Sequence, residues 1–130
     1  MKIFLALCCL PLILVSFAAA DPSPATHSER ERAAAALEQA TKTDPGNSEL
    51  WLHLGFAYRK SGDLDKAQAA FEKAAAVNPR SADAFYMLGL IYESRHQNAE
   101  AQKAWDSYMK LESDVNKRSI AQKHIHHLQQ

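Results

Sequence analysis

The histidines near the C-terminus, His124, His126 and His127, are the residues whose type and spacing come nearest to a metal site. His124 and His127 are three residues apart and could share one face of a helix. A structural zinc site takes four protein ligands, and no Cys, Asp or Glu stands close to these histidines in the sequence. We expect solvated histidines at a fraying C-terminus and no metal, and keep a histidine-based metal-binding protein as the third hypothesis.

Asp63 and Asp65 could serve as paired carboxylates for acid–base chemistry. Both stand where a helix is expected to begin, and negative side chains are favoured there by the helix dipole. The sequence shows no glycine-rich phosphate loop and no arrangement typical of nucleophilic catalysis. We therefore predict that the protein is not an enzyme and needs no cofactor.

The composition fits one small domain. The 130 residues include 15 Lys and Arg, 15 Asp and Glu, 47% hydrophobic residues and only 4 Gly. A formal net charge of zero provides no electrostatic attraction for nucleic acid or for an anionic membrane surface. Such a chain is expected to be a compact, soluble and helical domain.

The N-terminus has the pattern of a secretory signal peptide. Lys2 precedes an apolar run over residues 3–17, and residues 18–20 are three alanines. We predict that residues 1–20 are removed and that the protein is periplasmic or secreted, with no membrane insertion after cleavage. Cleavage would also remove Cys8 and Cys9, so the remaining chain would fold without a disulfide. The alternative is a retained N-terminal anchor.

A pattern of eight positions recurs at one constant spacing, and six of the eight pairs keep side-chain size or chemistry. The first copy consists of Trp51, Leu54, Gly55, Tyr58, Ala67, Phe71, Ala74 and Pro79, and the second of Phe85, Leu88, Gly89, Tyr92, Ala101, Trp105, Tyr108 and Ser113. The spacing from Trp51 to Phe85 is called here one repeat length. The second half of the same pattern occurs once upstream, as Ala33, Leu37, Ala40 and Pro45. The chain is thus built from internal repeats.

This pattern resembles the signature of the tetratricopeptide repeat. The resemblance implies an all-α fold, a right-handed solenoid of antiparallel helix pairs. It divides the chain into a flexible tether (21–27), a half-repeat (28–47), two full repeats (48–81 and 82–115) and a capping helix (116–130).

Local signals place the helices and their ends. We expect helices over Glu29–Thr41, Glu49–Lys60, Leu64–Val77, Ala82–Ser94 and from Asn98 to about Lys110, followed by a capping helix with an apolar stripe of Ile120, Ala121, Ile125 and Leu128. Gly62 suits a left-handed turn and Asp63 an N-cap, while Ser81 and Asn98 are further expected caps. No glycine stands between the helices of the second repeat, which predicts a strained or looser turn at His96 or Gln97.

Gly55 and Gly89 are expected in helix interiors, where glycine costs roughly 0.5–1 kcal/mol relative to alanine. Their occurrence at the same repeat position indicates close contact with a bulky side chain of the partner helix. We predict that Phe71 presses against Gly55 and Trp105 against Gly89.

In the family that this sequence resembles, the first helix of each pair lines an inner groove that holds a peptide or a partner helix. By position, the resemblance assigns partner binding to Glu49, Leu52, Phe56, Arg59, Asp83, Tyr86, Leu90 and Glu93. The four apolar side chains would form a strip with charges at its ends. Leu52 and Phe56 occupy places where some members grip a C-terminal carboxylate with lysine and asparagine, which argues against that mode. Alternatively, these residues only pack against neighbouring helices or against residues 21–28.

The leading hypothesis is an exported adaptor or scaffold that binds a protein partner, a peptide or helix of an envelope protein, during cell-envelope assembly. The alternative is a structural subunit that associates with copies of itself through the apolar strip and the exposed faces of the end helices. Light scattering separates the two, because a monomer excludes self-association.

Overall fold

The computed structural model describes residues 26–130, and within this range the chain forms helices and no strand. The elements are α1 (His27–Thr43), α2 (Ser48–Ser61), α3 (Leu64–Val77), α4 (Ala82–Ser94), α5 (Asn98–Leu111) and α6 (Val115–Leu128). The all-α repeat architecture is confirmed. The expected signal peptide, and residues 21–25 of the expected tether, lie outside the described residues.

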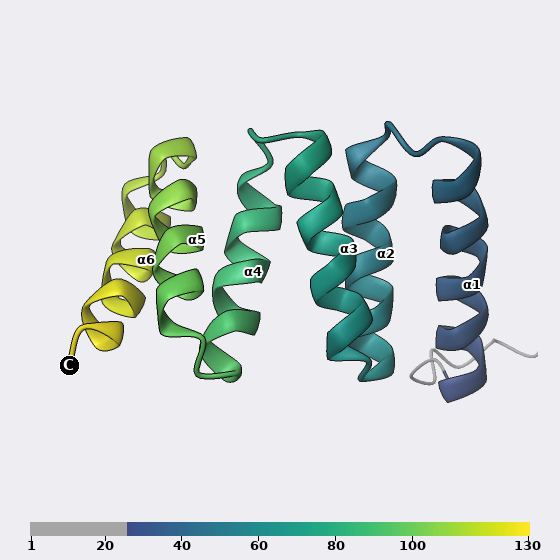
Figure 1. The fold of residues 1–130 in the computed structure, drawn as a ribbon, viewed down its shortest axis with the longest axis horizontal. Helices are drawn as coiled ribbons and strands as arrows, with labels where there is room; N and C mark the ends of the chain where they lie inside the picture. The colour runs from purple at the N-terminus through teal and green to yellow at the C-terminus, as the bar shows by residue number, and fades with distance from the viewer. Residues whose placement is uncertain (1–25) are drawn as a thin grey trace, which may run out of the picture.

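The helices follow one another along the long axis of the molecule, with α1 at one end and α6 at the other (Figure 1). Helices α2 and α3 form one antiparallel hairpin, and α4 and α5 form the next. Helix α1 packs on α2, and α6 packs on α5. Each full repeat is therefore one hairpin, and a single helix closes each end.

Helix α1 begins earlier than the sequence suggested. The Thr26 hydroxyl accepts a hydrogen bond from the Glu29 amide at 3.3 Å, and the Glu29 carboxylate accepts one from the Thr26 amide at 2.6 Å. This capping box starts the helix at His27 rather than at Glu29. Thr26 and His27 thus belong to the helical unit, not to a tether.

The two turns inside the repeats differ as the sequence predicted. Gly62 has a left-handed backbone with φ of 88°, and Asp63 then caps α3 by accepting from the Lys66 amide at 3.1 Å. In the second repeat His96 takes the left-handed position with φ of 57°, a conformation that costs a non-glycine residue about 1–2 kcal/mol.

The other two expected caps fare differently. Ser81 holds the N-cap position of α4, as predicted, but makes no capping side-chain hydrogen bond. The cap expected at Asn98 is wrong, because Gln97 holds the N-cap position of α5, also without such a bond. At this turn the Gln97 amide donates to the Tyr92 carbonyl at 2.9 Å, which closes the C-terminal end of α4.

Both helix glycines meet the predicted aromatic rings. A Cβ on Gly55 would lie 2.6 Å from Cε1 of Phe71, and a Cβ on Gly89 would lie 2.6 Å from Cε2 of Trp105. Phe71 and Trp105 are the largest side chains that are fully buried among the described residues. The core of each hairpin is therefore one aromatic ring laid on a bare helix backbone.

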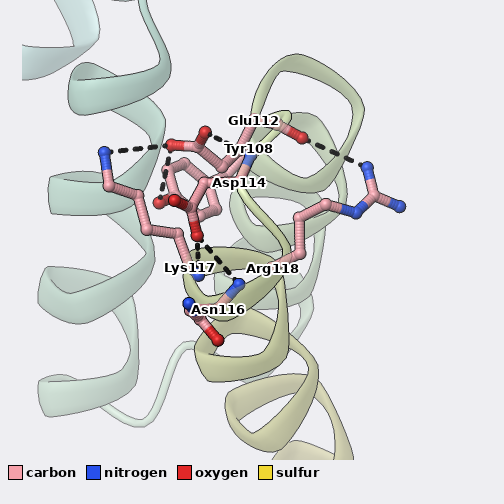
Figure 2. Close-up of polar contacts among 6 residues, drawn as sticks. All are labelled: Tyr108, Glu112, Asp114, Asn116, Lys117 and Arg118. Carbon is pink, nitrogen blue, oxygen red and sulfur yellow. Dashed lines mark hydrogen bonds and ion pairs between the residues drawn. The ribbon is translucent and has the colours of Figure 1, made fainter.

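A polar cluster at the α5–α6 turn sets the direction of the last helix (Figure 2). The Asp114 carboxylate caps α6 by accepting from the Asn116 and Lys117 amides at 2.8 and 3.0 Å. Arg118 donates to the Glu112 carbonyl at 3.2 Å, and Lys117 pairs with the Glu112 carboxylate at 3.5 Å. These contacts fold the chain back onto α5.

The predicted stripe of α6 is mostly confirmed. Ala121 and Ile125 are buried and Leu128 is half-buried, but Ile120 is 45% exposed. Since α6 has a neighbour on one side only, the edge of its stripe is left in solvent.

Candidate functional site

The candidate binding surface, called here the inner face, is formed by the first helices of the two repeats, α2 and α4. Glu49, Arg59 and Asp83 are exposed on it. Leu52 is only 6% exposed and belongs to the main core, so it contributes packing and hardly any accessible surface. The accessible apolar part of the inner face therefore reduces to Phe56, Tyr86 and Leu90, which are half-buried.

Phe56 has one side in the core and one side free. Its ring stands edge-on to Phe71, with 5.2 Å between centroids and an interplanar angle of 79°. The Arg59 guanidinium carbon lies 5.9 Å from the Phe56 centroid, within the range of a cation–π contact. The fold thus holds Phe56 in place and sets a positive charge beside it.

Tyr86 is fixed in the same way on the next helix. Its centroid is 5.4 Å from that of Trp105 and 5.3 Å from that of Tyr108. Leu90 packs between the two core clusters. Both side chains are held by the second repeat and the capping helix, so a partner would meet a rigid surface here.

The structure corrects the sequence-based interpretation of Glu93 and His124. Glu93 was expected at the solvent-exposed rim, but one carboxylate oxygen accepts from Trp105 Nε1 at 3.1 Å, and the other lies 2.8 Å from His124 Nδ1. The His124 ring stacks on Trp105, with 4.5 Å between centroids and 15° between planes. His124 is therefore a packing residue that joins α6 to the second repeat, not a solvated histidine.

The eight predicted residues do not share one cavity. Phe56 borders a groove of about 350 Å³ between α1 and α2. Leu90 and Glu93 border another, of about 450 Å³, between α4 and the end of α6. Phe56 and Leu90 of the inner face therefore border two different grooves.

A larger groove, which sequence reasoning missed, lies on the other side of α2. It has about 770 Å³ between α1 and α3, with Trp51, Leu54 and Tyr58 of α2 among its lining residues. Small side chains of α3, including Ala69 and Ala76, leave it open. The sequence signal that could have found it is the run of alanines in α3.

The tyrosines of the repeats are hydrogen-bonded to glutamates of the preceding unit. The Tyr58 hydroxyl donates to Glu38, and the Tyr92 hydroxyl donates to Glu72 at 2.7 Å. Burial, and then these bonds, raise the pKa of both tyrosines. The tyrosines thus stay neutral near pH 7 and act as struts between units rather than as acids or bases.

At the α5–α6 turn the titration of two groups is linked. Burial and the nearby Glu112 raise the pKa of Tyr108 to about 12. The Asp114 amide, which donates to Glu112 at 2.9 Å, is the main reason that the pKa of Glu112 is lowered. The carboxylate of Glu112 is thus kept charged where it pairs with Lys117.

The described residues, 26–130, contain neither a group of potential metal ligands nor a membrane-spanning helix. In this range no three His, Cys, Asp or Glu side chains are grouped so that they could hold a metal ion. No helix in the same range is long and apolar enough to cross a membrane.

Sequence comparison decides the family. Two tetratricopeptide repeat profiles match the chain, one over residues 28–71 and the other over residues 54–109. The chain belongs to the tetratricopeptide repeat family. Members of this family are typically protein-interaction modules without catalytic activity. No curated protein sequence matches the chain significantly.

Solved tetratricopeptide repeat structures share the fold at low sequence identity. The type III secretion translocator chaperone SycD of Yersinia enterocolitica has a TM-score of 0.71 at 14% identity, covering 78% of this chain and 73% of its own. The first tetratricopeptide repeat domain of Spaghetti (RPAP3), solved with the HSP90 peptide SRMEEVD, has a TM-score of 0.67 at 19% identity. That match covers 79% of this chain and 85% of the other.

Proposed function

We propose that this protein is an exported adaptor that binds a peptide or helix of an envelope protein through its inner face. The observation that carries the proposal is the pairing of rigid, half-exposed aromatic rings with exposed charges on that face. Phe56 and Tyr86 supply apolar area at small rotamer cost, which is the usual character of residues that dominate binding energy. Arg59, Glu49 and Asp83 surround them and would set the orientation of the partner.

Export rests on the sequence alone, on the apolar run and the alanines that precede Asp21. The test is the intact mass of the native protein. A mature chain that begins at Asp21 supports export, whereas a mass that still includes residues 1–20 in a membrane fraction contradicts it.

Peptide binding by a similar domain, the RPAP3 domain bound to an HSP90 peptide, supports a protein partner. We do not expect this chain to bind a C-terminal carboxylate, because Leu52 and Phe56 stand where carboxylate-binding members of the family carry lysine and asparagine. We expect the partner of this chain to offer apolar side chains to Phe56 and Tyr86.

The experiment should avoid residues that hold the core. The charges of the inner face are exposed, so Arg59→Ala combined with Asp83→Ala should leave the fold intact. The matched control is Lys73→Ala combined with Asp106→Ala, which removes the same charge types from exposed positions of α3 and α5.

Capture of the native envelope partner should weaken with the inner-face pair and stay unchanged with the control pair. A photo-crosslinking residue at the exposed position 49 of the inner face should become attached to the same partner. Capture that depends on the control pair instead would move the binding surface to α3 and α5.

Self-association through end-to-end stacking is disfavoured by α6. At the places where the repeat pattern carries large apolar or small residues, α6 has Ser119, Gln122, Lys123 and His126. A further helix could not pack closely on these polar side chains.

A further inference from the structure

Helix α1 exposes a face that is covered in both full repeats. Ala33 and Leu37 stand one repeat length before Ala67 and Phe71, which are fully buried. In α1, Ala33 is exposed and Leu37 is half-buried. Among residues 26–130, the α1 surface therefore has no counterpart of the helix that covers α3.

The counterparts show what this neighbour is. Phe71 is covered by α2, whose Gly55 and Phe56 lie against its ring, and Trp105 is covered by α4 through Gly89 and Tyr86. In each case the cover is the helix that comes just before in the chain and runs antiparallel. The groove of about 350 Å³ between α1 and α2 lies where such a helix would pack.

The adjoining surface of α2 agrees with this geometry. His53 and Ala57 line the groove and stand one repeat length before Met87 and Ile91, which are 5% and 3% exposed. In the second repeat these two positions are covered, whereas in the first His53 is exposed and Ala57 is half-buried. One missing helix explains the exposure on both α1 and α2.

The chain does not encode this helix at the repeat spacing. The segment one repeat length before α2 is 14–27, and it contains Pro22 and Pro24. Proline in a helix interior removes a backbone hydrogen bond and clashes with the preceding turn, at a cost of about 3 kcal/mol or more each. Two prolines at this spacing disfavour a covering helix encoded there, and the helix proposed below is therefore that of a partner.

The charge at one end of the groove indicates the chemistry of the occupant. Arg30 and Lys60 meet there, with Arg30 donating to the Lys60 carbonyl at 3.5 Å. The Glu29 carboxylate at the same end accepts from the Thr26 amide and keeps its charge, so two basic side chains stand beside one acidic side chain at this end of the groove. His53 adds a polar group where Met87 is buried in the next repeat.

We propose that the face of α1 and α2 around Ala33, Leu37 and Ala57 binds one amphipathic helix of a partner protein, which completes the first repeat. The helix runs antiparallel to α1, places a small residue against Leu37 and carries acidic side chains toward Arg30 and Lys60. This site is separate from the inner-face function proposed above, although Phe56 borders both surfaces. The combined Arg59→Ala and Asp83→Ala variant of the inner face should leave it unaffected.

The chain itself provides a defined probe, a peptide of the α4 sequence Ala82–Ser94. Its Gly89 would face Leu37, and its last turn, with Glu93, would reach the basic end of the groove. The labelled peptide should bind to the chain that begins at Asp21 and to the full-length chain, as measured by fluorescence anisotropy. The Gly89→Arg peptide, which is the better helix former, should not bind.

Two variants of α1 form a matched pair. Ala33→Arg fills the groove and should weaken binding of the peptide about tenfold or more, whereas Ala35→Arg, at an exposed position outside this groove, should change it less than about twofold. Circular dichroism should show the same helix content for both. A Glu93→Lys peptide should bind more weakly at low salt, and equal binding would overturn the acidic character of the partner.

Three results would overturn the proposal. The first is a peptide that fails to bind or that ignores Ala33→Arg. The second is binding to the chain from Asp21 but not to the full-length chain, which would assign the face to residues 1–20. The third is a dimer in light scattering that Ala33→Arg converts to a monomer, which would assign it to a second copy.

Discussion

The two full repeats share one frame and differ in what surrounds it. In both, a helix glycine receives an aromatic ring of the partner helix, and a tyrosine is bonded to a glutamate of the preceding unit. Phe71 packs edge-on against Phe56 and lies against Gly55, whereas Trp105 also stacks on His124 and donates to Glu93. The shared contacts thus follow from a few positions of the repeat. Trp105, which stands where the first repeat has Phe71, in addition attaches the capping helix.

Removing the buried rings should lower the stability of the two repeats more than any of the other substitutions below. Phe71→Ala and Trp105→Ala should each lower the free energy of unfolding by about 3–5 kcal/mol, because both side chains are fully buried. Trp105→Ala should in addition release α6, since its ring is the support for His124. Hydrogen exchange should therefore rise in α6 for Trp105→Ala and rise much less there for Phe71→Ala.

Trp51→Ala serves as the control for these two variants. Trp51 is only half-buried, and its Nε1 donates to the Pro45 carbonyl at 2.9 Å. Chemical denaturation should show a smaller loss than for Phe71→Ala. An equal loss would mean that the half-exposed ring supports as much of the core as the buried one.

The contact between glycine and ring should come next in size. Gly55→Ala and Gly89→Ala should each destabilise by about 1–3 kcal/mol, because the new methyl group would overlap ring carbons at 2.6 Å. This loss should appear although alanine is the better helix former. Thermal melts that move upward for either variant would show that the ring can shift aside.

The two turns offer a test with opposite signs. Gly62→Ala should destabilise and His96→Gly should stabilise, each by about 1 kcal/mol, since glycine alone adopts positive φ without steric cost. Denaturation midpoints of the two variants check the signs. Stability changes of the same sign in both variants would contradict the proposed difference between the two turns.

The tyrosine–glutamate bonds should give the smallest effect, seen at alkaline pH. Since the pKa values of Tyr58 and Tyr92 are raised in the folded state, their contribution to stability is complete below the unfolded value of about 10. It is lost as the pH rises through the folded values. Unfolding experiments from pH 8 to 11 should show this decline, and Tyr58→Phe with Tyr92→Phe should reduce it.

The candidate site was only partly predictable from the sequence. The repeat pattern placed Phe56, Tyr86 and Leu90 on the first helices, where the structure leaves them half-exposed. It also placed Leu52 and Glu93 in the accessible strip, although one lies in the core and the other is bound to Trp105 and His124. The position of a residue in the repeat predicts which helix it belongs to and in which direction its side chain points. It does not predict which other helix covers that side chain.

Local patterns in the sequence determined the family, the order of the helices, the left-handed turn at Gly62, a strained or looser turn at His96 or Gln97, and the contact of both glycines with aromatic rings. These features depend on neighbours in the chain or on the partner helix of the same hairpin, so spacing is sufficient to predict them. Only the tertiary structure decided that His124 reaches across α5 to Glu93, that α1 leaves a covered face of the repeat open, and that a groove runs between α1 and α3. These depend on how neighbouring hairpins and end helices pack, which is set by side-chain volumes from distant segments and not by the period of any one of them.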